Sequence, residues 1–491
     1  MPPRLAASFL TATLTLFCQS PAYQEPYRPQ FHFSPARNWT NDPNGLVYFE
    51  GEYHLFFQYN PFGDRWGHMS WGHAVSPDLV HWRELPVALP EENGIMIFTG
   101  STVVDQHNSS GFCAGAKPCL VAIYTAYTPE AASRPSLQTQ NLAYSNDRGR
   151  TWTKYAQNPV LDLHMSDFRD PKVLWSDRAQ RWVMAVSLPN DHKVRFYGSS
   201  DLKHWQTLSD FGPAGATSGQ WECPELFELP VDLKPGQSRW VLKVGLNPGA
   251  LQGGSGEQYF TGQFDGTRFT NDNPSTLTLW TDYGKDCYCA LTFNNLPDTQ
   301  SPVMIGWMNN WQYAADVPTS PWRGQMTVPR KLGLRTTPDG LRLVQNPIDS
   351  LEQLRHPWQP GSDTFELRAT VPLGNAKEVG WKLLAAGGTF TLVGFDREKQ
   401  QLFVDRTHSG DTSFNKDFPA HTTAPLQLDG SELRLRVLVD RSSIEVFADD
   451  GRIAITNLVF PPQSARGIEF YSKGGQPGAV KSELWTMGSI W

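Results

Sequence analysis

Three short segments each place a carboxylic acid in a turn-forming run with a proline and an aromatic residue. They are Asn38-Trp39-Thr40-Asn41-Asp42-Pro43-Asn44-Gly45-Leu46, Phe168-Arg169-Asp170-Pro171 and Trp221-Glu222-Cys223-Pro224. In the first, Pro43 favours an extended backbone at Asp42. An acid held among amides and an indole is suited to binding a sugar, and glycoside hydrolysis requires two acids. Singly, each acid is explained by a turn or capping role; together they predict one site.

The first residues indicate export. Arg4 supplies a positive charge, Leu5 to Phe17 form an apolar core, and Ser20 and Ala22 provide a cleavage pattern of small residues. Residues 1–22 are therefore predicted to be a secretory signal peptide. The apolar run is too short for a membrane span, so we expect a secreted, extracellular protein.

Composition excludes some classes of partner. The net charge of -7 provides no basic surface for nucleic acid or an anionic membrane, so neither is expected as a partner. The sequence contains no CxxC pair and no HExxH motif, and we predict neither a metal nor another cofactor. The 18 Trp residues include enough aromatic surface for stacking on sugar rings. Oligomeric state is not predicted.

Cysteines and sequons give further expectations for an exported chain. Cys113 and Cys119 flank a short loop and are the predicted disulfide. Cys287 and Cys289 alternate along an apparent strand and are interpreted as two small buried thiols. Asn108 lies in a sequon within a surface loop and is the candidate glycosylation site. The sequon at Asn38 lies too close to the predicted pocket for the same prediction.

Strand patterns dominate the sequence, and a degenerate repeat indicates how the strands are arranged. The segments 46–49 and 53–59 predict a hairpin around Glu50-Gly51. A Ser/Asp turn followed by Trp occurs three times, in Ser76 to Trp82, Ser145 to Trp152 and Ser200 to Trp205. Equivalent turns tens of residues apart are typical of propeller blades. The innermost strands of such blades run along one axis, which would bring the three acids together.

The second part of the chain has a different pattern. Residues 346–361 are polar and contain proline, which predicts a linker, with Asp349 to Arg355 as the clearest short helix. From residue 362 to 491, alternating strands such as 433–439 and 443–447 predict an antiparallel β-sandwich. The predicted catalytic unit is therefore residues 23–345. The fold class is all-β.

The sequence resembles glycoside hydrolase family 32, the β-fructosidases. The resemblance runs through nearly all of the mature chain in ordered blocks: Phe31-His32-Phe33, residues 38–46, Phe57-Gln58-Tyr59-Asn60-Pro61, Trp66-Gly67-His68, Phe98-Thr99-Gly100-Ser101, Arg169-Asp170-Pro171, Glu222-Cys223-Pro224, residues 306–313 and Val439-Asp440-Arg441-Ser442-Ser443. It implies a five-bladed β-propeller followed by a β-sandwich. It also implies a glycosidase that needs no cofactor and acts on a small or polymeric fructoside.

The same resemblance assigns roles to the acids. It makes Asp42 the nucleophile, Glu222 the general acid/base and Asp170 the carboxylate that stabilises the transition state. A fructosyl group leaves through an oxocarbenium-like state, so an anion at the anomeric carbon lowers the barrier. Retention of configuration would require the carboxyl groups of Asp42 and Glu222 to lie about 5–5.5 Å apart. Arg169 is expected to keep Asp170 ionised.

The resemblance also implies sugar contacts and a substrate class. The implied contacts are Asn41, Gln58, Trp66, Ser101, Arg169 and Trp307. Trp66 and Trp307 are equally compatible with packing between blades. Cys223 is compatible with small-residue packing or with an effect on Glu222. The segments 280–284 and 317–323 look like those of microbial levanases and exo-inulinases.

Three functions remain open at this point. The favoured one is a fructan β-fructosidase that releases terminal fructose from inulin or levan and also cleaves sucrose. A sucrose-preferring invertase or a fructosyltransferase is the alternative within the same fold. The third is a non-catalytic sugar-binding propeller, for which an acid/base pair would have no use.

Overall fold

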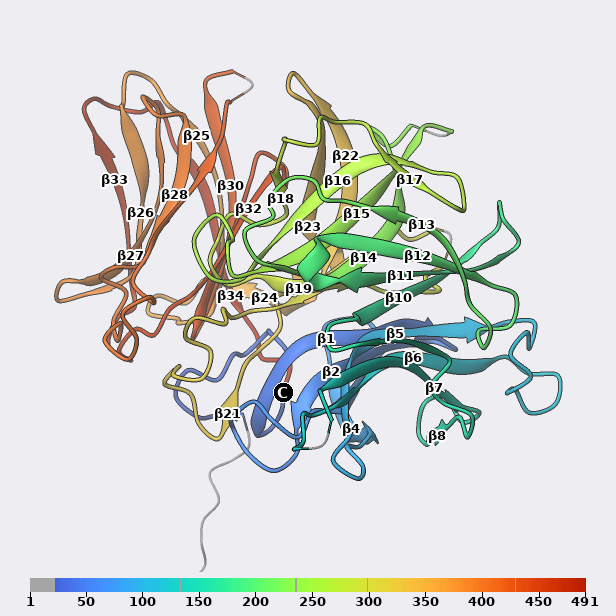
Figure 1. The fold of residues 1–491 in the computed structure, drawn as a ribbon. Coiled ribbons are helices and arrows are strands. Elements are labelled where there is room, and N and C mark those ends of the chain that lie inside the picture. Colours follow the sequence, from blue (N-terminus) through green and yellow to red (C-terminus); the bar gives the residue numbers. More distant parts are fainter. Residues whose placement is uncertain (1–22, 133, 235, 298, 429) are drawn as a thin grey trace, which may run out of the picture.

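The computed structural model describes residues 23–491 apart from 133, 235, 298 and 429. The predicted signal peptide, residues 1–22, lies outside the described residues. Five sheets form a propeller, and two further sheets form a sandwich beside it, as predicted (Figure 1). Helical structure in the described part of the chain consists of two 3-10 turns, η1 (Pro189–Asp191) and η2 (Asp349–Leu354).

The five propeller sheets follow one another along the chain. Blade 1 contains β21 (Trp322–Arg323), β1 (Asn38–Phe49), β2 (Glu52–Asn60), β3 (Ser70–Ser76) and β4 (Arg83–Leu89). Blade 2 contains β5 (Met96–Asp105), β6 (Cys119–Thr128), β7 (Leu137–Ser145), β8 (Thr153–Lys154) and β9 (Leu161–Met165). Blade 3 contains β10 (Arg169–Ser176), β11 (Arg181–Leu188), β12 (Lys193–Ser199) and β13 (Gln206–Phe211).

The last two blades complete the ring. Blade 4 contains β14 (Gln220–Pro230), β15 (Ser238–Asn247), β16 (Gly256–Phe264), β17 (Phe269–Asn271) and β18 (Leu279–Trp280). Blade 5 contains β19 (Tyr288–Thr292), β20 (Val303–Trp307), β22 (Arg330–Thr337) and β23 (Gly340–Pro347). The first strand of each blade contacts the first strand of the next, and β19 returns to β1. Each blade therefore contributes its first strand to the central axis.

Two features tie the blades together. The predicted hairpin at Glu50-Gly51 connects β1 and β2, which pair antiparallel. The short strand β21 lies between β20 and β22 in the sequence. It pairs in parallel with the beginning of β1. A segment of the last blade thus forms the inner edge of the first blade's sheet and closes the ring.

The repeated Ser/Asp turns connect the third and fourth strands of blades 1 to 3. In blade 1, Asp78 Oδ1 accepts hydrogen bonds from the backbone N–H groups of Val80 (3.0 Å) and His81 (2.9 Å). Asp201 accepts the same pair from Lys203 and His204 in blade 3. In each turn the Asp carboxylate accepts hydrogen bonds from backbone N–H groups that have no backbone carbonyl as partner. The same residues therefore form equivalent turns in separate blades.

The sandwich consists of a six-stranded and a five-stranded sheet. The first contains β24 (Arg355–Pro357), β34 (Lys481–Met487), β25 (Phe365–Pro372), β30 (Glu432–Asp440), β31 (Ser443–Ala448) and β32 (Ile453–Leu458). The second contains β29 (His421–Pro425), β28 (Gln401–Asp405), β27 (Thr389–Asp396), β26 (Glu378–Ala386) and β33 (Gly467–Lys473). Alternating apolar residues of the two sheets fill the core between them.

The segment between the two units differs from the predicted linker of residues 346–361. Strand β23 extends to Pro347, two residues beyond the predicted end of the catalytic unit. The predicted short helix is η2, and β24 then joins the sandwich by pairing with β34. The polar composition of the segment did not indicate this structure, because only a few apolar residues, Ile348, Leu351 and Leu354, anchor the segment in the core.

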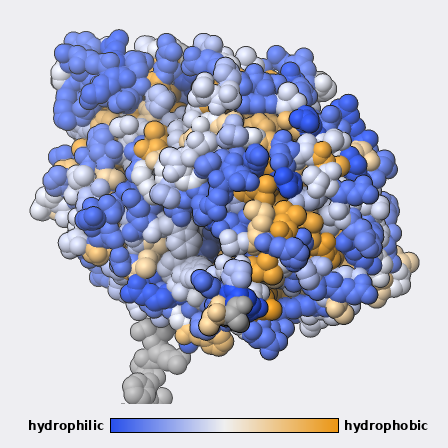
Figure 2. Space-filling view, viewed as in Figure 1, coloured by the Kyte–Doolittle hydropathy of each residue, from blue (hydrophilic) through white to orange (hydrophobic). Residues whose placement is uncertain are grey.

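The face of the molecule drawn in Figure 2 is covered mostly by hydrophilic side chains, with a smaller hydrophobic patch to the right of its centre. Among the helices of the described residues, none has the length and apolar character needed to cross a membrane.

Candidate active site

The five axial strands share an irregularity at the same level. Each has a shift of pairing register near its first residues, which marks a β-bulge. The shifts lie between Thr40 and Pro43 in β1, Ile97 and Gly100 in β5, Arg169 and Lys172 in β10, Glu222 and Glu225 in β14, and Tyr288 and Leu291 in β19. Bulges redirect side chains, and these direct residues of five blades toward one end of the axis.

Asp42 lies in the bulge of β1. Its Oδ2 accepts a hydrogen bond from the Thr99 hydroxyl of β5 (2.9 Å). Its Oδ1 is buried and has no hydrogen-bond partner among the described residues. Asn41 beside it is oriented by Trp39, whose indole N–H donates to the Asn41 amide oxygen (2.8 Å). Burial, then the charges of Asp170 and Glu222, raise the pKa of Asp42 to about 7.

Asp170 occupies the bulge of β10 with a left-handed backbone, φ 66°. Its N–H donates to the Thr125 hydroxyl (3.0 Å), and its Oδ2 accepts from the backbone N–H of Cys223 (2.9 Å). The sequence predicts that Arg169 keeps Asp170 ionised. In the structure burial outweighs the nearby guanidinium and, together with the charge of Glu222, raises the pKa of Asp170 to about 7.

Glu222 is held by two neighbouring blades. Its Oε1 accepts a hydrogen bond from Arg169 Nε of β10 (3.0 Å), and its Oε2 accepts one from the Tyr288 hydroxyl of β19. The Arg169 guanidinium also donates to Asp167 (2.8 Å) and Gln220 (2.8 Å). None of these hydrogen bonds goes to Asp170. Burial and the Glu222 charge raise the pKa of the Tyr288 hydroxyl well above its usual range, so it acts as a donor.

The three acids line one pocket with a volume of about 400 Å³. Aromatic side chains contribute to its wall: Trp66, Phe98, Tyr127 and Trp311. Amide side chains contribute polar groups: Asn41, Gln58, Gln138 and Asn247. Trp66 is 46% exposed, so much of its ring is accessible to a ligand. Apolar rings and a few polar groups form the usual lining of a small-molecule site.

Four of the six predicted sugar contacts line this pocket: Asn41, Gln58, Trp66 and Arg169. The other two lie behind its surface. Ser101 Oγ accepts a hydrogen bond from the Val173 N–H (2.9 Å), and the residue borders a much smaller cavity below the acids. Trp307 is fully buried and packs against Trp311 with ring centroids 4.8 Å apart. Trp311 therefore presents the ring that the sequence suggested for Trp307.

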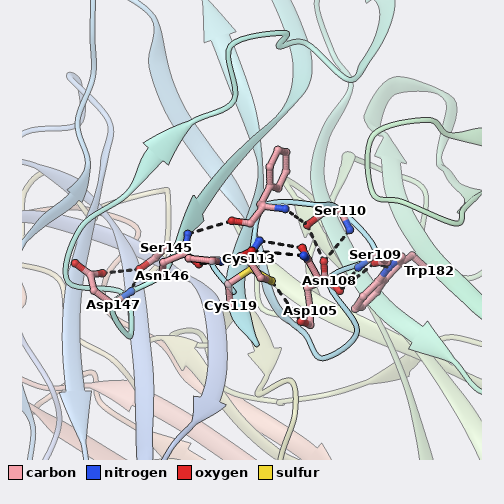
Figure 3. The surroundings of a disulfide bond; sticks show 12 residues. Asp105, Asn108, Ser109, Ser110, Cys113, Cys119, Ser145, Asn146, Asp147 and Trp182 are labelled. Atoms are coloured by element: carbon pink, nitrogen blue, oxygen red, sulfur yellow. Dashed lines mark hydrogen bonds between the residues drawn. A yellow bond between two sulfur atoms is a disulfide. The ribbon is translucent and has the colours of Figure 1, made fainter. Parts of the chain in front are cut away.

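The predicted disulfide is present. Cys113, in the loop before β6, is bonded to Cys119, the first residue of that strand (Figure 3). Asn108, the glycosylation candidate, is exposed in the same loop, where its Oδ1 accepts a hydrogen bond from the Cys113 N–H (2.9 Å). Asp105 organises the turn by accepting hydrogen bonds from Ser109 and Ser110 (Figure 3).

The prediction of two free thiols near residue 288 is wrong for Cys289. Cys289 forms a disulfide with Cys223, and Cys287 is the remaining buried free cysteine of the described residues. Alternation along a strand suggested a pair of packed thiols, whereas the bulges of β14 and β19 turn Cys223 and Cys289 toward each other. The disulfide lies beside Asp42, with Cys223 Sγ 3.7 Å from Asp42 Oδ2.

Comparison with known proteins identifies the family. Residues 32–347 match the N-terminal domain of glycosyl hydrolases family 32, and residues 333–486 match the C-terminal domain. The chain belongs to glycosyl hydrolase family 32. The first match ends at Pro347, the last residue of β23, so the family's N-terminal domain ends with the fifth blade.

The chain is similar to relatives that are named as a levanase and as exo-inulinases. A levanase of Bacillus subtilis (strain 168) is 48% identical and aligns over 96% of this chain and 72% of its own. An extracellular exo-inulinase of Aspergillus awamori is 43% identical over 96% of both chains. The crystal structure of that organism's exo-inulinase superposes with a TM-score of 0.91, covering 96% of this chain and 100% of the other at 42% identity.

A second solved structure carries a bound sugar derivative. It is the β-fructofuranosidase of Schwanniomyces occidentalis complexed with fructosyl-erythritol, which is 32% identical. It superposes with a TM-score of 0.85 and covers 95% of this chain and 99% of its own. Family-32 relatives with this fold therefore include proteins seen with fructosyl ligands.

Proposed function

We propose that this protein is a retaining glycosidase that releases terminal β-D-fructofuranosyl units from inulin, levan and sucrose through a covalent fructosyl-enzyme. One observation carries the proposal: Asp42, Asp170 and Glu222, from three different blades, line one pocket of a family-32 chain. The relatives named levanase and exo-inulinase support a fructan as the substrate.

In the first step, a carboxylate oxygen of Asp42 bonds to the anomeric carbon of the terminal fructosyl unit. Glu222 donates its proton to the glycosidic oxygen, the bond between that oxygen and the anomeric carbon breaks, and the leaving sugar departs as an alcohol. Asp42 lines the pocket, and the Thr99 hydroxyl holds its carboxylate in place by donating to Oδ2. Arg169 and Tyr288 orient the Glu222 carboxyl group.

In the second step, water attacks the same carbon while ionised Glu222 takes one of its protons. The bond to Asp42 breaks, fructose leaves, and Glu222 is again protonated. Asp170 lies in the same pocket and is held by the Cys223 N–H and by its own backbone anchor on Thr125. We assign it to the sugar hydroxyl groups and to stabilisation of the positive charge in the transition state.

The floor of the pocket supports attack from a chain end. Below the acids, the axis is filled by a buried ion pair between Lys172 and Glu225 (2.6 Å) and by the Cys223–Cys289 disulfide. A polymer cannot pass through this floor, so a terminal unit must enter first. A sucrose-preferring invertase or a fructosyltransferase is the second candidate, because the same acids serve both and the pocket alone does not choose the acceptor.

The assigned nucleophile is tested with Asp42→Asn. We expect fructose release from sucrose to fall by at least about 10⁴-fold, since no carboxylate then attacks the sugar. Circular dichroism and thermal unfolding would check the fold, and Asp339→Asn, an exposed aspartate, is the matched control. Near-normal turnover by folded Asp42→Asn would exclude the assigned role. A sugar-binding protein without catalysis would release no glucose from sucrose in the wild type.

The substrate is tested by initial rates on sucrose, inulin and levan with chromatography of the products. Release of fructose alone from the polymers is expected, and a ladder of oligosaccharides would contradict terminal attack. Transfer activity would produce longer sugars from sucrose. NMR of the first fructose released should show the β-anomer, because two displacements retain configuration; initial release of the α-anomer would exclude the covalent route.

Export and domain roles complete the proposal. The charged start, apolar core and small-residue pattern of residues 1–22 support secretion, as does the relative named an extracellular exo-inulinase. We assign catalysis to the propeller, residues 23–347, and structural support of the propeller to the sandwich. Detection of the mature chain in the culture medium, starting near Tyr23, would test export.

A further inference from the structure

We propose that the Cys223–Cys289 disulfide is a positioning element of the active site, which fixes the strand of Glu222 against that of Tyr288 and provides Asp42 with a neighbour that carries no proton. The inference rests on the proposed function. Both sulfur atoms belong to buried residues at the pocket floor. The sequence predicted a packed thiol at Cys289 and left Cys223 open between packing and an effect on Glu222.

The disulfide joins two strands that share no backbone ladder. β14 belongs to blade 4 and β19 to blade 5, and their sheets are separate. The two cysteines have left-handed backbones, φ 48° at Cys223 and 46° at Cys289, and a Cα–Cα distance of 5.4 Å. They therefore occupy equivalent places in the two bulges, and the covalent bond sets a spacing that hydrogen bonds between strands do not.

The residues before the two cysteines are the ones that contact each other in the site. Glu222 precedes Cys223, Tyr288 precedes Cys289, and the Tyr288 hydroxyl donates to Glu222 Oε2. The Cys223 N–H also donates to Asp170 Oδ2 (2.9 Å). A change in the separation of β14 and β19 would therefore move the proposed acid/base, its hydroxyl donor and an anchor of Asp170 together.

The sulfur atoms also determine what Asp42 contacts. Cys223 Sγ lies 3.7 Å from Asp42 Oδ2. A carboxylate oxygen of Asp42 and the sulfur atoms of Cys223 and Cys289 all lie within 4.8 Å of one another. A disulfide has no S–H group to donate and no charge. A free thiol at the same place would donate a weak hydrogen bond to the carboxylate, and a thiolate would add a second negative charge.

Peptide mapping of the unreduced wild-type protein tests the bond itself. Digestion after blocking of free thiols should yield a cross-linked peptide pair that contains Cys223 and Cys289, with Cys287 blocked. A wild-type protein with blocked Cys223 and Cys289 would overturn the inference. This measurement does not require activity, so its failure is separate from failure of the proposed function.

Kinetics on sucrose test the positioning role. For Cys223→Ala/Cys289→Ala we expect kcat to fall about tenfold or more, with a smaller change in KM, because small displacements of catalytic groups are costly. Cys113→Ala/Cys119→Ala removes the other disulfide, whose cysteines do not line the pocket, and should leave kcat unchanged. A double variant at 223 and 289 that loses stability but keeps the wild-type kcat per folded molecule would overturn the inference.

The pH profile of kcat/KM tests whether the sulfur beside Asp42 affects its carboxylate. Cys289→Ala leaves a thiol beside Asp42, which stabilises the carboxylate. The acidic limb of kcat/KM should therefore lie at lower pH than in the double variant. Coincident limbs would overturn this part of the inference.

If the double variant does not fold, wild-type protein made in a reducing compartment replaces it. Its kcat should be lower than that of oxidised wild type, while Cys113→Ala/Cys119→Ala should show the same dependence on oxidation. Equal activity of reduced and oxidised wild type would overturn the inference. Oxidised wild type without any fructose release would instead contradict the proposed function.

Discussion

Three acids in one pocket make the free protein sensitive to pH at the level of single residues. Burial raises the pKa values of Asp42 and Asp170 to about 7, and the mutual repulsion of the acids adds to this effect. A raised carboxyl pKa means that the folded state binds the proton more tightly than the unfolded state. The stabilisation of the folded state by this tighter proton binding is fully present below about pH 4. It is lost as the pH rises through about 7.

Asp42→Asn should therefore be more stable than wild type at neutral pH, although it is inactive. Ionised Asp42 costs free energy that the neutral amide does not, on the order of 2–4 kcal/mol above pH 7. The gain should shrink as pH falls toward 4. Thermal unfolding at pH 4, 6 and 8 would measure this, with Asp339→Asn as the exposed control. A stability difference that is the same at all three pH values would contradict the explanation.

Sequence patterns predicted residues that belong to local runs and missed those placed by neighbouring blades. Asp42, Asp170 and Glu222 are recognisable because each precedes or nearly precedes a proline in a similar run. Tyr288 has no such mark, and its contact with Glu222 depends on the meeting of β19 and β14. The exchange of Trp307 for Trp311 has the same origin, because depth in a blade is a tertiary property.

At the scale of elements, side-chain-stabilised turns connect the outer strands of the blades. Asp78 accepts two backbone hydrogen bonds in blade 1, and Asp201 accepts the equivalent two in blade 3. Asp265 accepts from the N–H groups of Thr267 and Arg268 in blade 4. The sequence repeat predicted the turns at Asp78 and Asp201 because Ser, Asp and Trp recur in both. It did not predict the turn at Asp265 in blade 4, which lacks the Trp.

Asp78→Ala should destabilise the protein by about 1–2 kcal/mol, because two backbone N–H groups lose their acceptor. Asp201→Ala should have a similar effect, since it makes the same bonds in an equivalent turn. Urea unfolding monitored by tryptophan fluorescence would give both values. Clearly different losses for the two variants would contradict the equivalence of the turns.

The bulge of β5 leaves no room for a side chain at Gly100. A Cβ there would lie 2.1 Å from the Ile123 carbonyl oxygen and 2.7 Å from Tyr124 Cα. Gly100→Ala should therefore push β5 from β6 and displace Thr99 from Asp42. We expect a loss of about 2 kcal/mol in stability together with reduced kcat.

Gly63→Ala is the matched control for this substitution, because the nearest atom to a Cβ at that position is 4.0 Å away. Unfolding by urea and kinetics on sucrose would be compared for both variants. Equal behaviour of Gly63→Ala and Gly100→Ala would show that space at the bulge is not limiting.

At the scale of the whole molecule, buried charges join the propeller to the sandwich. Arg330 of β22 donates to Asp282 (2.9 Å) and to Glu445 of β31 (2.6 Å). His32 places its Nδ1 2.8 Å from Asp440 and its Nε2 3.2 Å from Glu445. Both partners of His32 are carboxylates, which favours the doubly protonated, positively charged ring.

The charge of His32 should make the docking of the two units depend on pH. Burial alone would lower its pKa, but the hydrogen bonds to Asp440 and Glu445 raise it to about 9. The stability that it contributes is complete below about pH 6.5 and is lost as pH rises through 9.

His32→Gln should cost about 3–5 kcal/mol at pH 6 and less at pH 9. Thermal unfolding at the two pH values would measure the difference, and His204→Gln, which lies in an exposed turn, is the control. A cost that does not decrease at pH 9 would contradict a charged His32.

The sequence predicted both units but not how they are joined. Strand alternation and turn spacing are local patterns, and they were sufficient for blades and sandwich. The contacts of His32, Arg330 and β24 connect segments that are far apart in the chain, so composition gave no sign of them. The linker prediction failed in part for this reason.

The parallel pairing of β21 with β1 sets an order of events during translation. A ribosome makes the strand that carries Asp42 early, but Trp322 and Arg323, which cover its inner edge, emerge only when most of the polypeptide is complete. Nascent chains arrested before residue 322 should therefore hydrolyse no sucrose, even though all three acids have already been synthesised. Extending the arrest point past the fifth blade and the sandwich should restore turnover, which a series of stalled chains of increasing length would reveal.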